Sequence, residues 1–301
     1  MIITVCVASI GRNSLLETLD SLSGCKLQPD VSFNVVIADD SSNELVARLL
    51  SNQSKRWFFP IKVVRSASSN IAIARNHCLF NASGEYLAFI DDDEMADKDW
   101  LYNFVTLAKS SDADVIFGPV DAIYPNESPR WVCMAKPFMK RVGKSGTEVT
   151  TGSTCNAFVK KAVIDKFKLI FRPDLGQSGG EDTAFFSELS KYGATLIASD
   201  DSMVYEKVPL ERLTISHLSR RYIRGGQTYA SLFFSSRSVA FKISAYLAAL
   251  VKVIIFFFVV IFFYLFKKNI ALKYAFKLWL NLGKIRNLLN MPLINLYVEL
   301  P

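Results

Sequence analysis

The sequence has 301 residues, of which 50% are hydrophobic, and its formal net charge is +7 at pH 7. This length suffices for one large domain or two smaller ones, and the hydrophobic share is high for a wholly soluble protein. From residue 205 onward there are 14 Lys and Arg against 3 Asp and Glu, a net charge of +11. These basic residues flank very apolar segments, and no RNA-binding or helix-turn-helix signature occurs. The pattern therefore favours an anionic membrane surface, and not nucleic acid, as a partner.

The five cysteines are an odd number without close pairing, and no secretory signal or zinc-ligand spacing is visible. We therefore expect reduced thiols in a cytoplasmic compartment.

The first hundred residues alternate between predicted strands and helices. Apolar runs rich in β-branched residues predict strands at 2–8, 33–38, 61–64 and 86–90. Leucines at helical spacing predict a helix from residue 14 to about Gly24, and a second helix covers residues 71–80. Such alternation is typical of a parallel sheet with helices on both faces.

Acidic residues follow two of these strands directly. Asp39 and Asp40 end the second strand, and Asp91, Asp92 and Asp93 end the fourth. Ligands bind at the carboxyl ends of strands in such sheets, and adjacent carboxylates repel one another unless a cation or solvent neutralises them. Hard oxygen ligands suit Mg²⁺ or Mn²⁺. The alternative is a solvated acidic turn that caps the helix beginning near residue 97.

The sequence contains neither the G-x-G-x-x-G motif nor a Walker A loop. Both motifs bind the phosphates of a nucleotide in α/β proteins. If this sheet binds a nucleotide, we therefore expect a metal ion and basic side chains to neutralise its phosphates.

A set of residues in this first third resembles the first half of family 2 glycosyltransferases, which have the GT-A fold. The residues are Ser9, Asp39, Asp40, Arg75 and the triplet 91–93. The resemblance implies a mostly parallel twisted sheet, flanked by helices, that binds a nucleotide-sugar donor. It assigns Asp39 and Asp40 to the nucleoside, Asp91 or Asp92 to the vicinity of the ribose, and Asp93 to a divalent ion on the diphosphate. After the first strand the family usually has Pro-Thr-Tyr-Asn, whereas this sequence has Ala-Ser-Ile-Gly at 8–11, in which only Ser9 carries a hydroxyl. Ser9 and Arg75 are the remaining predicted donor-binding residues.

The middle of the chain contains a predicted helix at 100–110, a strand at 114–118 and a long loop at 124–149. Trp131 in this loop suits an acceptor sugar or lipid-diphosphate surface, although ordinary packing explains it equally well. Residues 151–161 resemble the turn and strand that precede the acceptor site in the family.

A second acidic pair follows two glycines, in the order Gly179, Gly180, Glu181, Asp182, and opens a predicted helix that ends near Gly193. Acids in a first helical turn stabilise the helix dipole by only about 0.3 to 1 kcal/mol. The resemblance implies instead that Asp182 is the catalytic base, with Glu181 binding the acceptor or supporting the base.

Strands at 196–198 and 203–206 precede a segment that resembles bacterial exopolysaccharide glycosyltransferases, including those that build succinoglycan. Arg220, Arg221 and Arg224 recur there at one-turn spacing. We expect at least one of them, with Arg220 and Arg224 as candidates, to reach the departing diphosphate. The alternative is solvated helix charge.

Residues 243–266 form an apolar segment long enough to cross a bilayer core. Its seventeen Leu, Ile, Phe and Val residues favour insertion by roughly 5 to 10 kcal/mol, against about 3 kcal/mol for burying Lys252. The tail after this segment is basic, and basic segments tend to remain on the cytoplasmic side, where the catalytic domain is also expected. A re-entrant or in-plane arrangement, which keeps both ends on one side, therefore competes with a single span. Residues 271–289 are predicted to form a basic amphipathic helix on the cytoplasmic face.

The sequence thus predicts a GT-A catalytic domain at 1–230 and membrane-associated helices at 231–301. The predicted activity is that of an inverting hexosyltransferase. It uses Mn²⁺ or Mg²⁺ to move a sugar from a nucleotide-sugar, a UDP-sugar in the first instance, to a lipid-linked oligosaccharide or polysaccharide acceptor in cell-surface polysaccharide biosynthesis. The expected location is the cytoplasmic face of the bacterial inner membrane. Two alternatives are a nucleotidyltransferase and a non-catalytic membrane scaffold that retains the fold.

Overall fold

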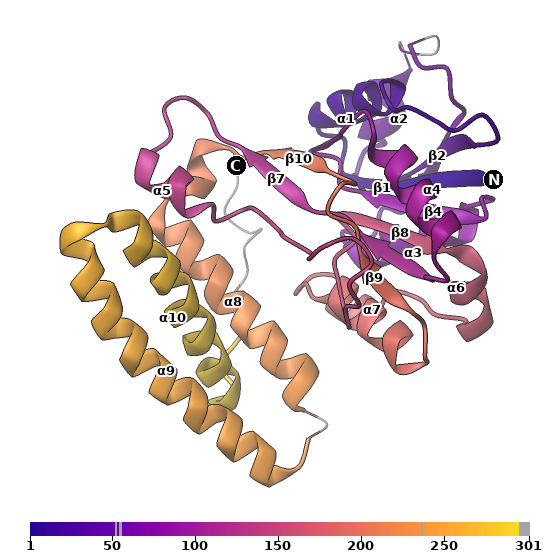
Figure 1. Cartoon of the computed structure of the whole chain (residues 1–301). Helices are drawn as coiled ribbons and strands as arrows, with labels where there is room; N and C mark the ends of the chain where they lie inside the picture. Colours follow the sequence, from indigo (N-terminus) through magenta and orange to yellow (C-terminus); the bar gives the residue numbers. More distant parts are fainter. Residues whose placement is uncertain (52, 54–55, 236, 295–301) are drawn as a thin grey trace. The chain divides into compact units, whose positions relative to one another are not determined.

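The computed structural model describes residues 1–51, 53, 56–235 and 237–294, and it divides into two compact units (Figure 1). The first unit comprises residues 1–122 and 139–207, and the second comprises residues 123–138 and those from 208 onward. The first unit is α/β and the second is largely helical. The predicted architecture, an α/β sheet followed by a C-terminal helical segment, is confirmed.

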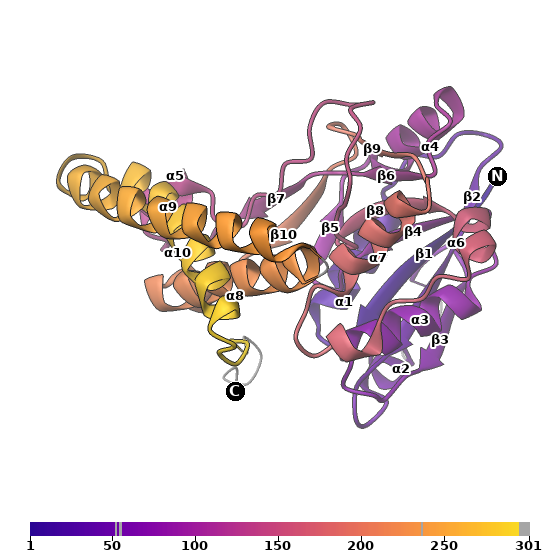
Figure 2. The same cartoon turned by 90° about the horizontal axis from the view of Figure 1, so that it is seen from below.

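The first unit is built on a seven-stranded sheet with the order β3-β2-β1-β4-β8-β6-β9. The strands are β1 Ile2–Ser9, β2 Ser32–Asp39, β3 Ile61–Arg65, β4 Tyr86–Ile90, β6 Val115–Phe117, β8 Asn156–Lys160 and β9 Leu196–Ala198. Neighbouring strands are parallel except at β8, which is antiparallel to both β4 and β6. Figure 2 shows β8, β4 and β1 as neighbours. The sheet is therefore mostly parallel, as predicted.

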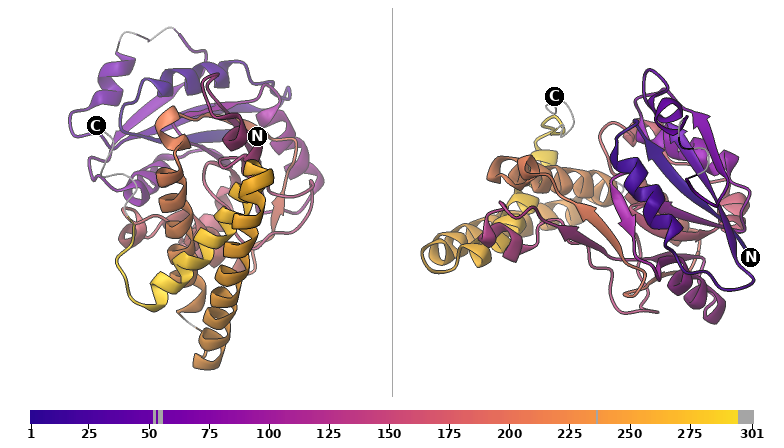
Figure 3. Two further views of the ribbon diagram at one scale, coloured as in Figure 1. Left: turned by 90° about the vertical axis from the view of Figure 1, so that its left-hand side faces the viewer. Right: turned by 90° about the horizontal axis from the view of Figure 1, so that it is seen from above.

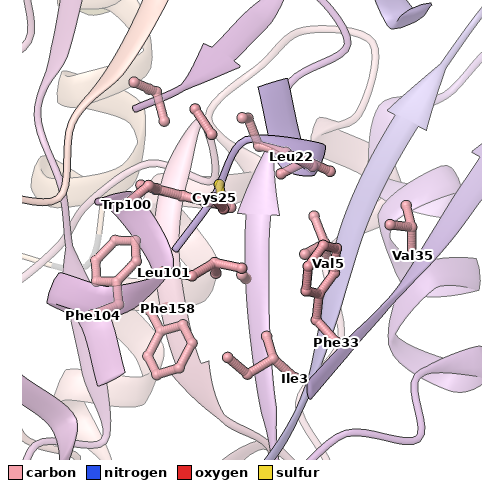
Figure 4. Close-up of a cluster of buried hydrophobic side chains, with 14 of the residues drawn as sticks. Ile3, Val5, Leu22, Cys25, Phe33, Val35, Trp100, Leu101, Phe104 and Phe158 are labelled. Atoms are coloured by element: carbon pink, nitrogen blue, oxygen red, sulfur yellow. The ribbon is translucent and has the colours of Figure 1, made fainter. Parts of the chain in front are cut away.

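Helices cover both faces of this sheet because its strands are apolar on both sides. The helices of the first unit are α1 Ser14–Ser23, α2 Leu45–Leu50, α3 Ile71–Asn81, α4 Trp100–Ser110, α6 Lys161–Phe167 and α7 Glu181–Lys191, with a 3₁₀ turn at Pro173–Leu175. Along β1, Ile3, Val5 and Val7 face a core shared with α1, α2 and α4, whereas Cys6 faces a core shared with α3, α6 and α7. Figure 4 shows part of the first core. Both cores hold the carboxyl ends of β1, β2 and β4 in place.

A three-stranded sheet follows the acidic triplet, with the order β5-β10-β7. Its strands are β5 Glu94–Ala96, β7 Val120–Ile123 and β10 Val204–Lys207. The buried amide of Asn156 donates to the carbonyls of Pro119 and Ser202, at 2.8 and 2.7 Å, and accepts from the indole N–H of Trp100 at 2.8 Å. One satisfied polar side chain thus ties α4 and β8 to the segments that enter this sheet.

The predicted long loop is more regular than expected. It contains α5 Arg130–Ala135, which begins after Pro129, and Lys140 forms a β-bridge with Val120. The fixed φ of proline suits the start of a helix, a local signal that the length of the loop obscured.

The second unit contains the helices α5, α8 Ile215–Phe234, α9 Val239–Phe266 and α10 Lys268–Leu288, with a 3₁₀ turn at Leu210–Leu213. Helix α10 packs against both α8 and α9 (Figures 1 and 3). Gly226 of α8 and Gly283 of α10 permit a very close approach. A Cβ atom at either position would lie 1.9 Å from a carbonyl oxygen of the other helix.

The compact units do not coincide with the predicted boundary at residue 230. Helix α8, predicted to belong to the catalytic domain, packs on α10 within the second unit. The assignment of catalysis to residues 1–230 stays a prediction. Within the described residues, α9 is the helix that is long and apolar enough to cross a membrane, with a mean hydropathy of 2.8.

Candidate active site

The acidic triplet lies beside the end of β1 because β1 and β4 are adjacent parallel strands. Their register pairs Cys6 with Phe89, so three residues further along Ser9 lies beside Asp92. The Ser9 hydroxyl donates to Asp92 Oδ2 at 2.7 Å. Arg12, in the loop after β1, donates to Asp92 Oδ1 at 3.1 Å, and its Nη1 lies 3.5 Å from Asp93 Oδ2. The segment that replaces the family's usual motif is therefore in direct contact with the triplet.

The three acids of the triplet differ in exposure. The side chains of Asp91 and Asp93 are 39% and 23% exposed, whereas that of Asp92 is 6% exposed. Burial raises the pKa of Asp92 to about 6, although Arg12 and the Ser9 hydroxyl act in the opposite direction. Asp92 is thus an internal partner of the β1 loop, and Asp91 and Asp93 are the members that a ligand can approach.

Glu94 closes the turn that carries the triplet. Its buried carboxylate accepts from the backbone N–H of Asp91 at 3.0 Å, and burial raises its pKa. This contact orients the exposed acids.

The two acids after β2 have different surroundings. Asp40 accepts hydrogen bonds from the backbone N–H groups of Ser68, Ser69 and Asn70 at 2.6 to 3.1 Å, and from the Ser68 hydroxyl. Its carboxylate therefore holds the loop that leads into α3. Asp39 accepts from Ser41 through Oδ1, while its buried Oδ2 has no partner among the described residues. Buried polar atoms are nearly always hydrogen-bonded, so Asp39 Oδ2 is a candidate ligand contact.

Arg75 joins the two acidic segments that the sequence predicted separately. From α3, its buried guanidinium donates through Nη2 to Asp91 at 3.2 Å and through Nη1 to Glu181 at the start of α7. Burial opposes its charge, but attraction to Glu181 and Asp91 outweighs burial and raises its pKa. Burial also raises the pKa of Glu181, whose Oε2 is buried without a partner among the described residues.

Asp182 follows Glu181 in α7 but has only neutral hydrogen-bond donors. Its Oδ2 accepts from the Ser153 hydroxyl at 2.7 Å, and its Oδ1 accepts from the backbone N–H of Thr183 at 2.6 Å. The Thr151 hydroxyl donates to the Thr183 carbonyl at 3.1 Å. The predicted turn at residue 151 thus fixes the rotamer of Asp182, and the carboxylate is partly exposed.

The donor set at the strand end fits a hard divalent ion. Asp91 and Asp93 offer partly exposed carboxylate oxygens, and no group of three or more His, Cys, Asp or Glu suited to a metal ion occurs in the described part of the chain. Mg²⁺ and Mn²⁺ are commonly bound by one or two carboxylates, with water and substrate phosphate completing the shell. The residues therefore suit an ion that arrives with a diphosphate.

The remaining predicted site residues belong to the second unit. Trp131 lies in α5, and Arg220 and Arg224 lie in α8, all partly buried. Their predicted contacts with acceptor and diphosphate stay predictions.

Arg12 and Ser153 were not identified from the sequence. Each lies in a loop that is distant in sequence from the acid it contacts, by 80 and 29 residues. The order of strands would have revealed Arg12, because the loop after β1 must adjoin the loop after β4.

Comparison with known families gives two matches that together cover most of the chain. The sequence profile described as Glycosyl transferase family 2 matches residues 2–167, and the profile described as Glycosyl transferase family group 2 matches residues 86–286. The first match contains the triplet and the second contains both the triplet and Asp182.

Among curated proteins, the chain is similar to the succinoglycan biosynthesis protein ExoM of Rhizobium meliloti (strain 1021). The two are 35% identical over 230 residues, which are 76% of this chain and 74% of that protein.

Two solved structures share the fold. The mannosyltransferase PcManGT from Pyrobaculum calidifontis, in complex with GDP-Man and Mn²⁺, has a TM-score of 0.61 at 18% identity over 96% of this chain and 88% of that one. S. aureus TarS 1–349, in complex with UDP-GlcNAc, has a TM-score of 0.55 at 19% identity over 80% and 69%. The chain spans 45% of the longer TarS structure. At these identities the likeness concerns the GT-A fold alone.

Proposed function

Because the chain belongs to glycosyl transferase family 2 and is therefore a glycosyltransferase, we propose that it inverts the anomeric configuration of a sugar that it moves from a nucleotide-sugar, a UDP-sugar in the first instance. The proposed acceptor is a lipid-linked oligosaccharide of a cell-surface polysaccharide, and the proposed location is the cytoplasmic face of the membrane. The similarity to a succinoglycan biosynthesis protein and the apolar helix α9 support these assignments.

One observation carries the proposal: Arg75 contacts Asp91 of the strand-end triplet with one nitrogen and Glu181 of the α7 pair with another. The predicted donor site and the acidic pair that contains the predicted base are thus joined by one buried cation, because Glu181 immediately precedes Asp182. An inverting transfer requires this proximity, because the base must activate the acceptor hydroxyl beside the sugar carbon that the donor presents.

The donor half of the proposed site consists of strand-end residues. Asp39 Oδ2 accepts a hydrogen bond from the nucleoside and thereby satisfies its buried oxygen. Asp93, with Asp91 beside it, holds the divalent ion. When bound, this ion supplies positive charge that stabilises the departing diphosphate. Asp40 acts indirectly, since its hydrogen bonds to residues 68–70 fix the loop in front of α3.

Asp182 serves as the base in the acceptor half. It accepts the proton of the acceptor hydroxyl as the oxygen attacks the anomeric carbon from the face opposite the diphosphate. Ser153 and the Thr183 N–H hold the carboxylate in one orientation without adding a competing positive charge. Glu181 Oε2 is available to a hydroxyl of the acceptor sugar.

The donor site is tested by thermal titration of the detergent-purified chain with UDP, GDP, CDP and dTDP, each with and without Mn²⁺. A ligand at 100 times its Kd stabilises the folded state by about 2.7 kcal/mol. We expect one nucleotide to raise the melting temperature only with Mn²⁺, and Asp93→Ala to abolish the shift. Asp165→Ala, which removes an exposed acid that pairs with Lys161 on α6, should leave it intact.

Catalysis is tested with the nucleotide-sugar of the nucleotide that stabilises the protein. Mn²⁺-dependent release of nucleoside diphosphate, lost in Asp182→Asn, supports transfer, and NMR of the product should show the inverted anomer. Nucleotide binding without turnover of any donor would favour the non-catalytic scaffold.

A further inference from the structure

Helix α9 meets α10 along a regular seam. Its least exposed residues recur at alternating spacings of three and four, which is the periodicity of packed helix pairs: Tyr246, Ala249, Val253, Phe256, Val260 and Phe263. Tyr246 donates to Asn287, and the rings of Phe256 and Phe263 both contact Tyr274. The two helices are therefore antiparallel and in contact over most of the length of α9.

The partner helix carries charge alongside the middle of α9. Lys277 Nζ lies 5.8 Å from the ring centroid of Phe256, fewer than four residues from the midpoint of α9. Lys284 lies close enough to Lys252 for the two ammonium groups to repel each other. Because a helix rises 1.5 Å per residue, the bilayer centre would fall within about one helical turn of these lysines if α9 crossed the membrane.

If α9 crossed the bilayer, α10 would enter it too, because α10 packs along α9, and α8 would follow because it packs on α10. Gly226 and Gly283 bring the α8 and α10 backbones together, and Tyr222 stacks on Phe276 with ring centroids 4.3 Å apart. A crossing α9 would take both helices with it. The apolar side chains of α9 outweigh the free-energy cost of burying Lys252 alone. They do not outweigh the cost of burying Lys277 and Lys284 as well, together with Arg286 and the arginines of α8.

The remaining surface of α9 is apolar along its whole length. Its outward-facing side chains are about half or more exposed, among them Ile243, Leu250, Ile254, Phe258 and Leu265. This row extends over more than twenty residues without an acidic group. The same helix pair also carries exposed lysines, Lys252 on α9 and Lys273 and Lys277 on α10. An apolar face of this length together with these lysines suits the interface of an anionic bilayer.

We propose that α9 does not cross the membrane but lies in the plane of one leaflet, so that α8, α9 and α10 form a monotopic platform on an anionic lipid surface. The outward face of α9 contacts the acyl chains. Lys252, Lys273 and Lys277 extend their ammonium groups to lipid phosphates while their methylene stems remain among apolar side chains. This inference rests on the membrane attachment proposed above, but not on the sugar transfer.

The test is a depth profile of the full chain bound to vesicles of phosphatidylethanolamine and phosphatidylglycerol at a 3:1 ratio. Single cysteines replace Ile243, Leu250, Ile254, Phe258 and Leu265 in turn and carry a nitroxide label. Cys133, the one partly exposed native cysteine among the described residues, is replaced by Ser throughout. Accessibility to oxygen and to a polar nickel complex then reports the depth of each label.

The in-plane arrangement predicts similar depths of about 5 to 10 Å for all five labels. A crossing helix predicts a maximum near Ile254, about 15 Å from either interface, and shallow values at Ile243 and Leu265. That profile would overturn the proposal, as would failure of the chain to bind the vesicles. A label at Lys273, on the exposed side of α10, should report headgroup depth. UDP binding, measured on the same samples, shows separately whether the proposed donor site is intact.

Intact cells supply a second measurement. In spheroplasts, Lys268→Cys should react with a membrane-impermeant maleimide only after lysis, because the turn between α9 and α10 stays on the side of its synthesis. Reaction before lysis would overturn the proposal. Neutralisation by Lys273→Gln and Lys277→Gln together should weaken binding to the anionic vesicles by about fivefold per lysine, and Lys191→Gln on α7 should not.

Discussion

The strand-end triplet and the acidic pair of α7 lie on different elements, but within each of them the neighbouring acids differ in their partners. In the triplet, Asp92 is held by Arg12 and Ser9. In the pair, Glu181 is held by Arg75, whereas in the described part of the chain Asp182 accepts hydrogen bonds from neutral groups, the hydroxyls of Ser153 and Thr183 and the backbone N–H of Thr183. Each cluster thus contains one buried acid neutralised by an arginine and a more exposed acid beside it. The difference suggests a division of work, in which the neutralised acids fix geometry and the exposed ones carry out chemistry.

The largest effect should come from removing the exposed acid of the α7 pair. Asp182→Asn keeps the size of the side chain and its hydrogen bonds to Oδ1 but cannot accept the proton, so kcat should fall by about 10² to 10⁴. The melting temperature should change little. Glu188→Gln, on the same helix and bonded to Tyr192, is the control. A loss below about threefold in Asp182→Asn would show that the base lies elsewhere.

Removing the shared cation should instead affect stability. Arg75→Met leaves Glu181 buried without a counter-ion, which should cost about 3 to 5 kcal/mol in the free energy of unfolding at pH 8. The pKa of Glu181, already raised by burial, would rise further. Because stability is then lost as pH rises through the folded-state pKa, the variant should be less impaired at pH 5 than at pH 8.

Chemical denaturation at the two pH values measures this difference. The double variant Arg75→Met with Glu181→Gln removes the uncompensated charge and should recover much of the stability. An equal loss in the single and double variants would mean that Arg75 acts through packing.

The neutralised acid of the triplet should show a smaller effect that depends on pH. Asp92 has a pKa of about 6 in the folded protein, above its ordinary value of 3.8. Wild type should therefore lose stability relative to Asp92→Asn as pH rises from about 4 to about 6, by roughly 3 kcal/mol at most. Denaturation of both proteins at pH 4, 5, 6 and 7 follows the difference. A constant difference across this range would mean that Asp92 has an ordinary pKa.

The smallest effect concerns the neutral partner of the base. Ser153→Ala removes one hydrogen bond to Asp182, so kcat should fall by about threefold to tenfold, equivalent to roughly 0.7 to 1.4 kcal/mol. Ser110→Ala, at the exposed end of α4, should leave kcat unchanged. An effect of Ser153→Ala as large as that of Asp182→Asn would assign the serine a direct part in the reaction.

Much of the fold was predictable because it depends on local pattern. The strands at Tyr86–Ile90 and Leu196–Ala198 and the helix at Trp100–Ser110 have the predicted bounds. Most other predicted helices and strands of the first unit differ by a residue or two at their ends, whereas α2, α6, β5 and β7 were not predicted. Strand-end acids were recognised for the same reason, since a β-branched run followed by Asp is visible in a short window. The resemblance to family 2 glycosyltransferases is confirmed by the family matches.

Contacts between residues far apart in the sequence were not predicted, because they depend on the order of the strands and on packing, and not on local pattern. The pairing of Arg75 with Glu181 joins residues 106 positions apart, and that of Arg12 with Asp92 joins residues 80 apart. Asp39 and Asp40 look equivalent in sequence, yet both oxygens of Asp40 accept hydrogen bonds, whereas Asp39 Oδ2 has no partner among the described residues. The packing of α8 on α10 depends on two glycines that have no local signature.

The position of α10 between its two partners also sets an order of events in time. Helices α8 and α9 leave the ribosome before the helix on which they both pack has been made. Until then the seam of α9 and the glycine face of α8 are both uncovered, and α9 is the most apolar segment of the chain. During synthesis there is therefore a stage at which the apolar surface of α9 is complete but α10, which packs on it, has not yet been made. At that stage chaperones or the membrane must bind the exposed apolar surface to prevent aggregation.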